Sequence, residues 1–174
     1  MNIYKDIIKS TLILISIITL IVSAVIVVYN YTYVEPVEGL SGKAITAAKE
    51  LLNTEQISDI KIDGLDESVK AIGKDENGNH AVYLSIKGYA GNGSIEMVVA
   101  VNSENQVIGV QIISNKDTPG LGTKVNDTDF LDSFTEKSAD SISTENIDTI
   151  AGATISSKAV IEGVNTALQL TDDR

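Results

Sequence analysis

The strongest constraint on this chain is a long run without charge near its N-terminus. No charged residue occurs from Ser10 to Val34, and the middle of the run reads LILISIITLIVSAVIVVY. A hydrocarbon core about 30 Å thick needs roughly 20 apolar helical residues, so this run is long enough to span a membrane. A cleaved signal peptide has a shorter apolar region, typically about 7–15 residues, whereas this run continues past the small residues Ser23 and Ala24. The sequence therefore predicts an uncleaved transmembrane anchor over residues 10–34, rather than a signal peptide or a buried soluble helix.

The residues that flank the anchor predict its direction. Lys5 and Lys9 precede the run and Glu35 and Glu38 follow it, so the positive-inside rule places residues 1–9 in the cytoplasm. Aromatic rings favour the membrane–water interface, and three tyrosines lie at the far end of the run: Tyr29, Tyr31 and Tyr33. Residues 35–174 are then expected to form one extracytoplasmic domain of a single-pass protein of the cell membrane.

Composition narrows the chemistry of that domain. The formal net charge of the chain is −11, and such an acidic surface repels phosphate backbones, so we expect no nucleic-acid partner. The chain has no cysteine, which excludes disulfides, thiolate-held iron–sulfur clusters and a cysteine nucleophile. Its one histidine, His80, is expected to be a solvated residue at a strand end, and no metal site is expected. Chemistry must then come from hydroxyls, carboxylates, backbone amides or a bound cofactor.

Hydrophobic periodicity predicts an α+β fold, in which helices pack on an antiparallel sheet behind the anchor. Helical patterns occupy residues 39–53, 127–138 and 155–170. Strand patterns occupy residues 57–62, 69–72, 80–89, 94–101 and 107–114, with an Asn-Gly turn before the third. Residues 115–127 are predicted to be a loop, because Pro119, Gly120 and Gly122 interrupt either regular structure.

Hydroxyl and small residues gather at the start of the last predicted helix. The stretch IDTIAGATISSKAV, residues 147–160, places Gly152 and Ala153 just before Thr154, Ser156 and Ser157. The first turn of a helix has free N–H groups and a positive dipole end, which bind anions, and small residues let a bulky group approach. A hydroxyl that only caps the helix is the alternative. The stretch thus indicates either a phosphate-bearing ligand or an ordinary N-cap.

Two glycine-rich stretches precede this cluster. GYAGNGSIEM, residues 88–97, has three glycines between two strand patterns, more than a tight hairpin requires, which indicates backbone in close approach to another group. TPGLGTK, residues 118–124, displays Leu121 on a Pro-Gly turn. Either stretch alone is weak evidence for a binding site.

In this order, behind a single anchor, the three stretches resemble the FMN-binding domain of bacterial respiratory complexes. GYAGNGSI resembles its Gly-Tyr-x-Gly stretch, TPGLG its Thr-Pro-Gly-Leu-Gly loop, and DTIAGAT its flavinylation motif. The pattern resembles first the G subunit of the Rnf electron-transport complex, and second the C subunit of the Na⁺-translocating NADH:quinone reductase. Two residues depart from the family's usual pattern: Ala151, where a hydroxyl residue is common, and Asp117, where Glu is common.

The resemblance implies a set of cofactor-binding residues. FMN would be bound covalently through a phosphoester to Thr154, made by a separate flavin transferase that uses FAD and Mg²⁺. Asp148 would matter for that transfer, and Gly152 and Ala153 would give the transferase access. Ser156 and Ser157 would either bind the phosphate or cap the helix. The ring or ribityl chain would contact the turn formed by Thr118, Pro119, Gly120, Leu121 and Gly122, and Tyr89 would pack either on the ring or in the sheet.

The function implied is that of an electron-carrying redox subunit of an Rnf-type complex, in which ferredoxin is oxidised, NAD⁺ is reduced and Na⁺ or H⁺ crosses the membrane. Its partners would be membrane, flavin and iron–sulfur subunits. No G-x-G-x-x-G precedes a helix, and no catalytic acid–base pair is evident, so no complete active site is expected in this chain. The alternatives are a component of a quinone reductase, a stand-alone extracytoplasmic flavoprotein, and an anchored binding or assembly module without flavin, against which Thr154 argues.

Overall fold

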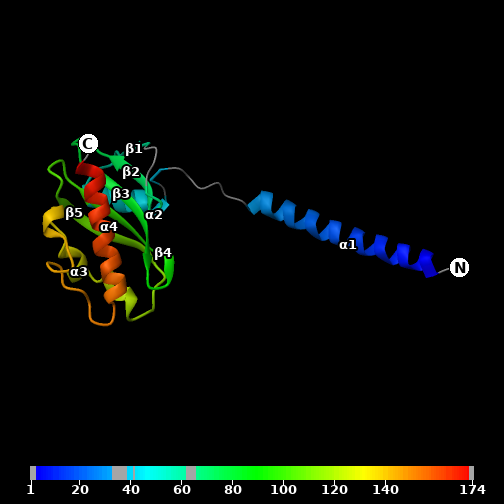
Figure 1. Ribbon diagram of the computed structural model, residues 1–174. Coiled ribbons are helices and arrows are strands. Elements are labelled where there is room, and N and C mark those ends of the chain that lie inside the picture. Colours follow the sequence, from blue (N-terminus) through cyan, green and yellow to red (C-terminus); the bar gives the residue numbers. More distant parts are fainter. Residues whose placement is uncertain (1–2, 33–38, 41, 62–65, 173–174) are drawn as a thin grey trace. The chain divides into compact units, whose positions relative to one another are not determined.

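The computed structural model describes residues 3–32, 39–40, 42–61 and 66–172, and the chain divides into two units, residues 1–36 and 37–174. The described part of the first unit is one helix, α1 (Ile3–Thr32) (Figure 1). Its stretch Ile7–Tyr29 is long and apolar enough to cross a membrane, and none of it is buried. The predicted flanking residues Tyr33, Val34, Glu35 and Glu38 lie outside the described residues.

The second unit is built on a five-stranded antiparallel sheet whose strands follow one another in chain order. The strands are β1 (Ser58–Ile60), β2 (Val69–Lys74), β3 (His80–Gly88), β4 (Gly91–Val101) and β5 (Val107–Asn115). From β2 to β5 the meander forms because short turns, at residues 75–79, 89–90 and 102–106, join neighbouring antiparallel strands directly. The predicted α+β fold, with one apolar N-terminal helix, is confirmed.

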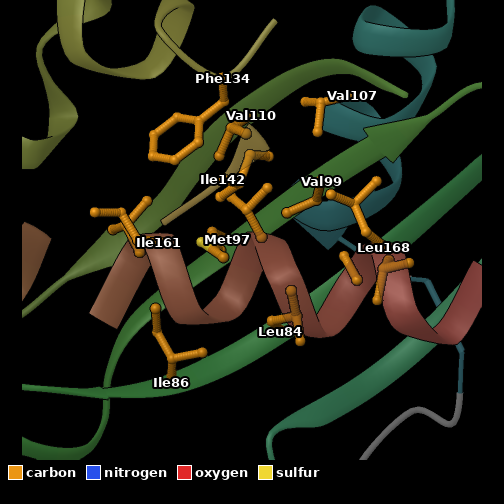
Figure 2. Close-up of a cluster of buried hydrophobic side chains, with 14 of the residues drawn as sticks. Leu84, Ile86, Met97, Val99, Val107, Val110, Phe134, Ile142, Ile161 and Leu168 are labelled. Atoms are coloured by element: carbon orange, nitrogen blue, oxygen red, sulfur yellow. The ribbon is translucent and has the colours of Figure 1, made fainter. Parts of the chain in front are cut away.

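Helices cover both faces of the sheet: α4 (Thr154–Asp172) on one face and α2 (Gly42–Leu52) on the other (Figure 1). Side chains alternate between the faces along a strand, so Leu84, Met97 and Val99 pack toward α4, where Figure 2 shows them along the helix that carries Ile161 and Leu168. The face toward α2 carries smaller side chains, among them Ala71, Ala81, Val98 and Ala100. The larger core therefore lies between the sheet and α4 and fixes the position of that helix on the sheet.

The segment between β5 and α4 contains η1 (Gly122–Asn126), α3 (Thr128–Asp132) and η2 (Ala139–Ser141). The helix predicted over residues 127–138 is shorter than expected. Glu136 has a positive φ of 63°, and its N–H donates to the Val107 carbonyl while the Lys137 carbonyl accepts from the Val107 N–H. Pairing with the start of β5 ends the helix early. Phe130 and Phe134 are buried, with their rings edge to face at 5.3 Å.

Two expectations for the sheet need correction. Gly88 pairs with Gly91, so Tyr89 and Ala90 form the turn itself, and β4 already begins at Gly91. His80 does begin a strand, but it is only 6% exposed, so the prediction of a solvated histidine was wrong. The reason is its place in the sheet, since it is paired with a residue of β2 on one side and a residue of β4 on the other.

Candidate functional site

A hollow of about 440 Å³ lies where the three motifs meet. It is lined by the β3–β4 turn, the loop after β5 and the start of α4, through Tyr89, Thr118, Leu121, Gly122, Gly152, Ala153, Thr154, Ile155 and Ser156. Every one of these residues except Ile155 was predicted from the sequence as part of one site. The order of the strands and the packing of α4 on the sheet bring the β3–β4 turn, the loop after β5 and the start of α4 together at one end of the domain.

Thr154 is the first residue of α4, and its side chain is exposed at the hollow. The Ala153 carbonyl accepts the N–H of Ser157 at 2.8 Å, which is the first bond of the helix. Helix geometry then leaves the N–H groups of residues 154–156 without intrahelical acceptors. An accessible hydroxyl thus stands beside free N–H groups at the positive end of a helix dipole, an arrangement that suits a phosphate.

Three large apolar side chains line the same hollow as Thr154. Tyr89 is 65% exposed, Ile155 is 55% exposed and Leu121 is 47% exposed, and all three line the hollow. Among the described residues of the second unit, these are the large apolar side chains that remain exposed. Apolar side chains gathered in one place on an otherwise polar surface mark a binding site. Sequence reasoning missed Ile155, although its signal was present: a branched apolar residue directly after the predicted attachment residue.

Asp117 lies behind the hollow, 2% exposed, and joins its walls. Its carboxylate accepts hydrogen bonds from the Tyr89 N–H at 3.0 Å, the Ala90 N–H at 2.8 Å and the Ser156 hydroxyl at 2.6 Å. Burial alone would raise the pKa of this carboxyl, but bonds from Ser156, Ala90, Tyr89 and Ser94 outweigh it and hold the pKa below its ordinary value. The group is therefore ionised at neutral pH.

Two glycines make room for this carboxylate. A Cβ on Gly88 would lie 2.5 Å from an Asp117 carboxylate oxygen, and a Cβ on Gly122 would lie 2.6 Å from the Asp117 Cβ and 2.8 Å from the Ser156 Oγ. Real Cβ atoms do not approach other atoms this closely. The close approach predicted for the GYAG stretch, and the glycine that ends TPGLG, therefore both have a physical cause within the protein.

The two serines of the helix start bond to protein groups through their side chains. Ser156 donates to Asp117, and the Ser157 Oγ accepts the Ile150 N–H at 3.1 Å. Both serines are buried, at 1% and 0% exposed. Of the two roles left open by the sequence, the hydrogen bonds favour an internal one for both hydroxyls.

The remaining predicted residues lie outside the lining of this hollow. Pro119 and Gly120 are exposed in the turn, where the Gly120 N–H donates to the Thr123 hydroxyl at 2.9 Å. Asp148 is exposed and lines a separate hollow of about 520 Å³, together with Asp127, Lys137 and others. The structure therefore does not bring Asp148 together with Thr154 in one pocket, and its role stays a prediction.

Comparison with known proteins agrees with this site. Residues 88–169 match the FMN-binding domain, a range that contains all three motifs. The G subunit of the proton-translocating ferredoxin:NAD(+) oxidoreductase complex of Clostridium ljungdahlii is 31% identical, over 87% of this chain and 85% of that protein. The chain belongs to the FMN-binding domain family.

Other members of the family match over shorter stretches. The G subunit of an ion-translocating oxidoreductase complex of Methanosarcina acetivorans is 32% identical, over 55% of this chain and 54% of that protein. The G subunit of the Na(+)-translocating ferredoxin:NAD(+) oxidoreductase complex of Acetobacterium woodii is 34% identical, over 48% and 44%. The crystal structure of the C subunit of the Na(+)-translocating NADH-quinone reductase from Parabacteroides distasonis covers 77% of this chain and 72% of its own, at 16% identity and a TM-score of 0.45.

The residues around the hollow fit FMN. A volume of about 440 Å³ lies within the range of small-molecule pockets, roughly 300–1,000 Å³. FMN has a flat aromatic ring system, with one apolar edge, at one end and a phosphate at the other. The hollow likewise has an apolar rim (Tyr89, Leu121 and Ile155) and, next to it, a helix start with a hydroxyl.

Proposed function

We propose that this chain is an electron-transfer subunit of an Rnf-type ion-translocating ferredoxin:NAD⁺ oxidoreductase complex, and that it carries FMN joined by a phosphoester to Thr154. The observation that carries the proposal is the exposed Thr154 hydroxyl at the first residue of α4, beside a hollow with an apolar rim. The family and the relatives that are G subunits of such complexes support it. As in such complexes, the partners are membrane, flavin and iron–sulfur subunits.

When bound, FMN supplies the redox chemistry by taking up and giving up electrons. The chain's own residues hold and orient it. The N–H groups at the start of α4 offset the charge of the phosphate. Leu121 and Ile155 offer apolar surface to the ring, and Tyr89 offers an aromatic face, which stacks well on a flat ring system.

Attachment requires a flavin transferase as a second partner. The Thr154 Oγ forms a bond to the phosphorus on the riboflavin side of FAD, the phosphoanhydride bond breaks, and AMP leaves while the hydroxyl proton passes to a base of the transferase. Thr154 and Gly152 are both exposed, which leaves the hydroxyl accessible to another protein. Asp148 is exposed on the lining of a separate hollow, where it would act on the transferase rather than on the bound flavin.

The apolar helix α1 anchors the protein in the cell membrane, with residues 1–9 in the cytoplasm and the FMN-binding domain outside it. A covalent bond suits this location, because a dissociated FMN would be lost from the cell. The alternatives, a component of a quinone reductase or a stand-alone flavoprotein, keep the same site and differ only in the partner proteins.

The test is the intact mass of the full chain, co-expressed with an active flavin transferase, beside Thr154→Ala and the matched hydroxyl control Thr149→Ala. We expect the wild-type chain and the Thr149 variant to gain one FMN less one water, and the Thr154 variant to gain nothing. An unmodified wild-type chain, with the transferase active on another substrate, would refute the attachment. Purification from native membranes then identifies the complex by the proteins that accompany the modified chain.

A further inference from the structure

We propose that Asp117 is the positioning residue of this site: its carboxylate fixes the first turn of α4, and with it Thr154, against the other two walls of the hollow. The chemical consequence rests on the proposed function, since it concerns transfer of FMN to Thr154. The positional consequence does not, because it concerns the protein before any flavin is attached.

The hydrogen bonds of Asp117 join segments that are far apart in the sequence. They reach Ala90, Tyr89 and Ser156, which are 27, 28 and 39 residues away in the sequence. Two of these residues form the β3–β4 turn, and the third lies two residues after Thr154 in the first helical turn. Asp117 itself directly precedes the TPGLG loop. One side chain thus ties together the three segments that line the hollow.

The Asp117 side chain is tightly packed and has no room to move. Gly88 and Gly122 pack directly on Asp117, and the Gly88 N–H donates to the Ser94 hydroxyl at 2.9 Å. On the loop side, the Asp117 N–H donates to the Asn115 Oδ1 at 2.9 Å, and the Asn115 side chain also donates to the Asn126 Oδ1 at 2.9 Å. A displacement of Asp117 would therefore move the turn, the loop and the helix start together.

The burial of the Asp117 charge has an energetic cost. A buried carboxylate is costly unless it is paired or fully hydrogen-bonded. Within the described residues no cation forms an ion pair with Asp117, so its charge is compensated by N–H and O–H donors. Those donors come from the walls of the hollow. The compensation of the charge and the geometry of the site therefore depend on the same bonds.

The first experiment is amide hydrogen exchange on the flavin-free full chain in detergent, comparing wild type with Asp117→Asn and the milder Ser156→Ala. Asp75→Asn is the matched control, since Asp75 is also buried and accepts N–H bonds, from Asn77 and Asn79. We expect Asp117→Asn to speed exchange at residues 89, 90, 153 and 157 about tenfold or more, and Ser156→Ala to do so at residues 153 and 157, whose N–H groups are hydrogen-bonded at the helix start. Asp75→Asn should affect only residues 77–79. Equal exchange at the site in wild type and Asp117→Asn would overturn the inference, with or without flavin.

The second experiment measures flavin transfer to the same proteins under steady-state conditions, with the chain as the varied substrate. The transferase meets the same exposed side chains in each variant, so we expect KM to change less than twofold. Misplacement of the hydroxyl should lower kcat for Asp117→Asn about tenfold or more. Asp75→Asn should match wild type in both constants. An unchanged kcat for Asp117→Asn would overturn the inference. A wild-type chain that accepts no FMN would instead overturn the proposed function, and the hydrogen-exchange experiment alone would then test the positioning role of Asp117.

Discussion

Two buried aspartates in this domain both accept several hydrogen bonds, one from residues close to it in the sequence and the other from residues far from it. Asp75 accepts the N–H groups of Asn77 and Asn79 and a side-chain N–H of Asn79, each at 2.8 Å, and so closes the turn between β2 and β3. Asp117 accepts N–H and O–H groups from residues 27 to 39 positions away. The pKa of each carboxyl is lowered because these hydrogen bonds outweigh the effect of burial. The first aspartate shapes a local turn, and the second assembles a site.

Removing each carboxylate in turn should give the largest difference in stability between the two aspartates. Asp117→Ala leaves the buried hydroxyl of Ser156 without its acceptor and also frees the N–H groups of Tyr89 and Ala90, so we expect it to lower the free energy of unfolding by about 3 kcal/mol. Asp75→Ala should cost about 1 kcal/mol, because its donors belong to exposed or half-exposed residues that water can reach. Urea unfolding of both variants at neutral pH measures the difference. Equal losses would mean that the long-range bonds contribute no more than the turn does.

Crowding Asp117 should have the next largest effect. The Cβ of Gly122→Ala would lie 2.6 Å from the Asp117 Cβ, and neither backbone can retreat without breaking the hydrogen bonds of the loop. Overpacking of this kind typically costs about 1–3 kcal/mol, and we expect about 2 kcal/mol here. The measurement is again urea unfolding, together with intact mass after flavin transfer, which should fall in parallel. A variant as stable as wild type would show that the loop can shift to accommodate the added Cβ without loss of stability.

The same difference in range explains what could be predicted from the sequence. The Asn-Gly turn at residues 77–78, the alternating strands and the apolar stripe of the last helix are local patterns, and each produced an element near its predicted place. The three motifs were grouped correctly around one hollow because the family resemblance carries that long-range information. The carboxylate of Asp117 was noted only as a departure from the family, since nothing local reveals that its partners are Tyr89, Ala90 and Ser156.

The failures have the same cause. The helix predicted at residues 127–138 ends at Asp132 because its far end pairs with the start of β5, which no local propensity encodes. His80 is buried because of the strands on its two sides. Ile155 was passed over because a single apolar residue in a helical pattern is normally a core residue, whereas here it is 55% exposed at the rim of the hollow.

Deleting one side chain that donates a hydrogen bond to each aspartate should give a smaller difference in the free energy of unfolding. Ser156→Ala deletes a buried hydroxyl that donates to Asp117 at 2.6 Å, and we expect a loss of about 1.5 kcal/mol, since bonds to charged groups are the stronger ones. Asn79→Ala deletes a donor to Asp75 at a half-exposed turn and should cost about 0.5 kcal/mol. Thermal and urea unfolding compare the two. If the double variant of Ser156→Ala with Asp117→Asn showed strictly additive losses, the bond between them would carry no coupling energy.

The smallest expected effect is on how the free energy of unfolding depends on pH in the acid range. Because the pKa of Asp117 in the folded protein lies below the value of about 3.9 that an unfolded chain has, the unfolded state takes up the proton first as the pH falls. The stability that this carboxylate contributes is therefore fully present above about pH 5 and is lost progressively as the pH falls through the folded pKa. Asp117→Asn should be less stable than wild type at pH 7 but should lose less stability between about pH 5 and pH 3, which urea unfolding at several pH values measures.

The control for this acid effect is the local aspartate. Asp75→Asn should flatten the pH curve in the same direction, since the pKa of Asp75 is also lowered, yet without any change in flavin transfer at pH 7. A curve for Asp117→Asn parallel to that of wild type would show that Asp117 binds its proton alike in the folded and unfolded chains. Its hydrogen bonds would then not favour the ionised form, and the difference between the two aspartates would be one of geometry alone.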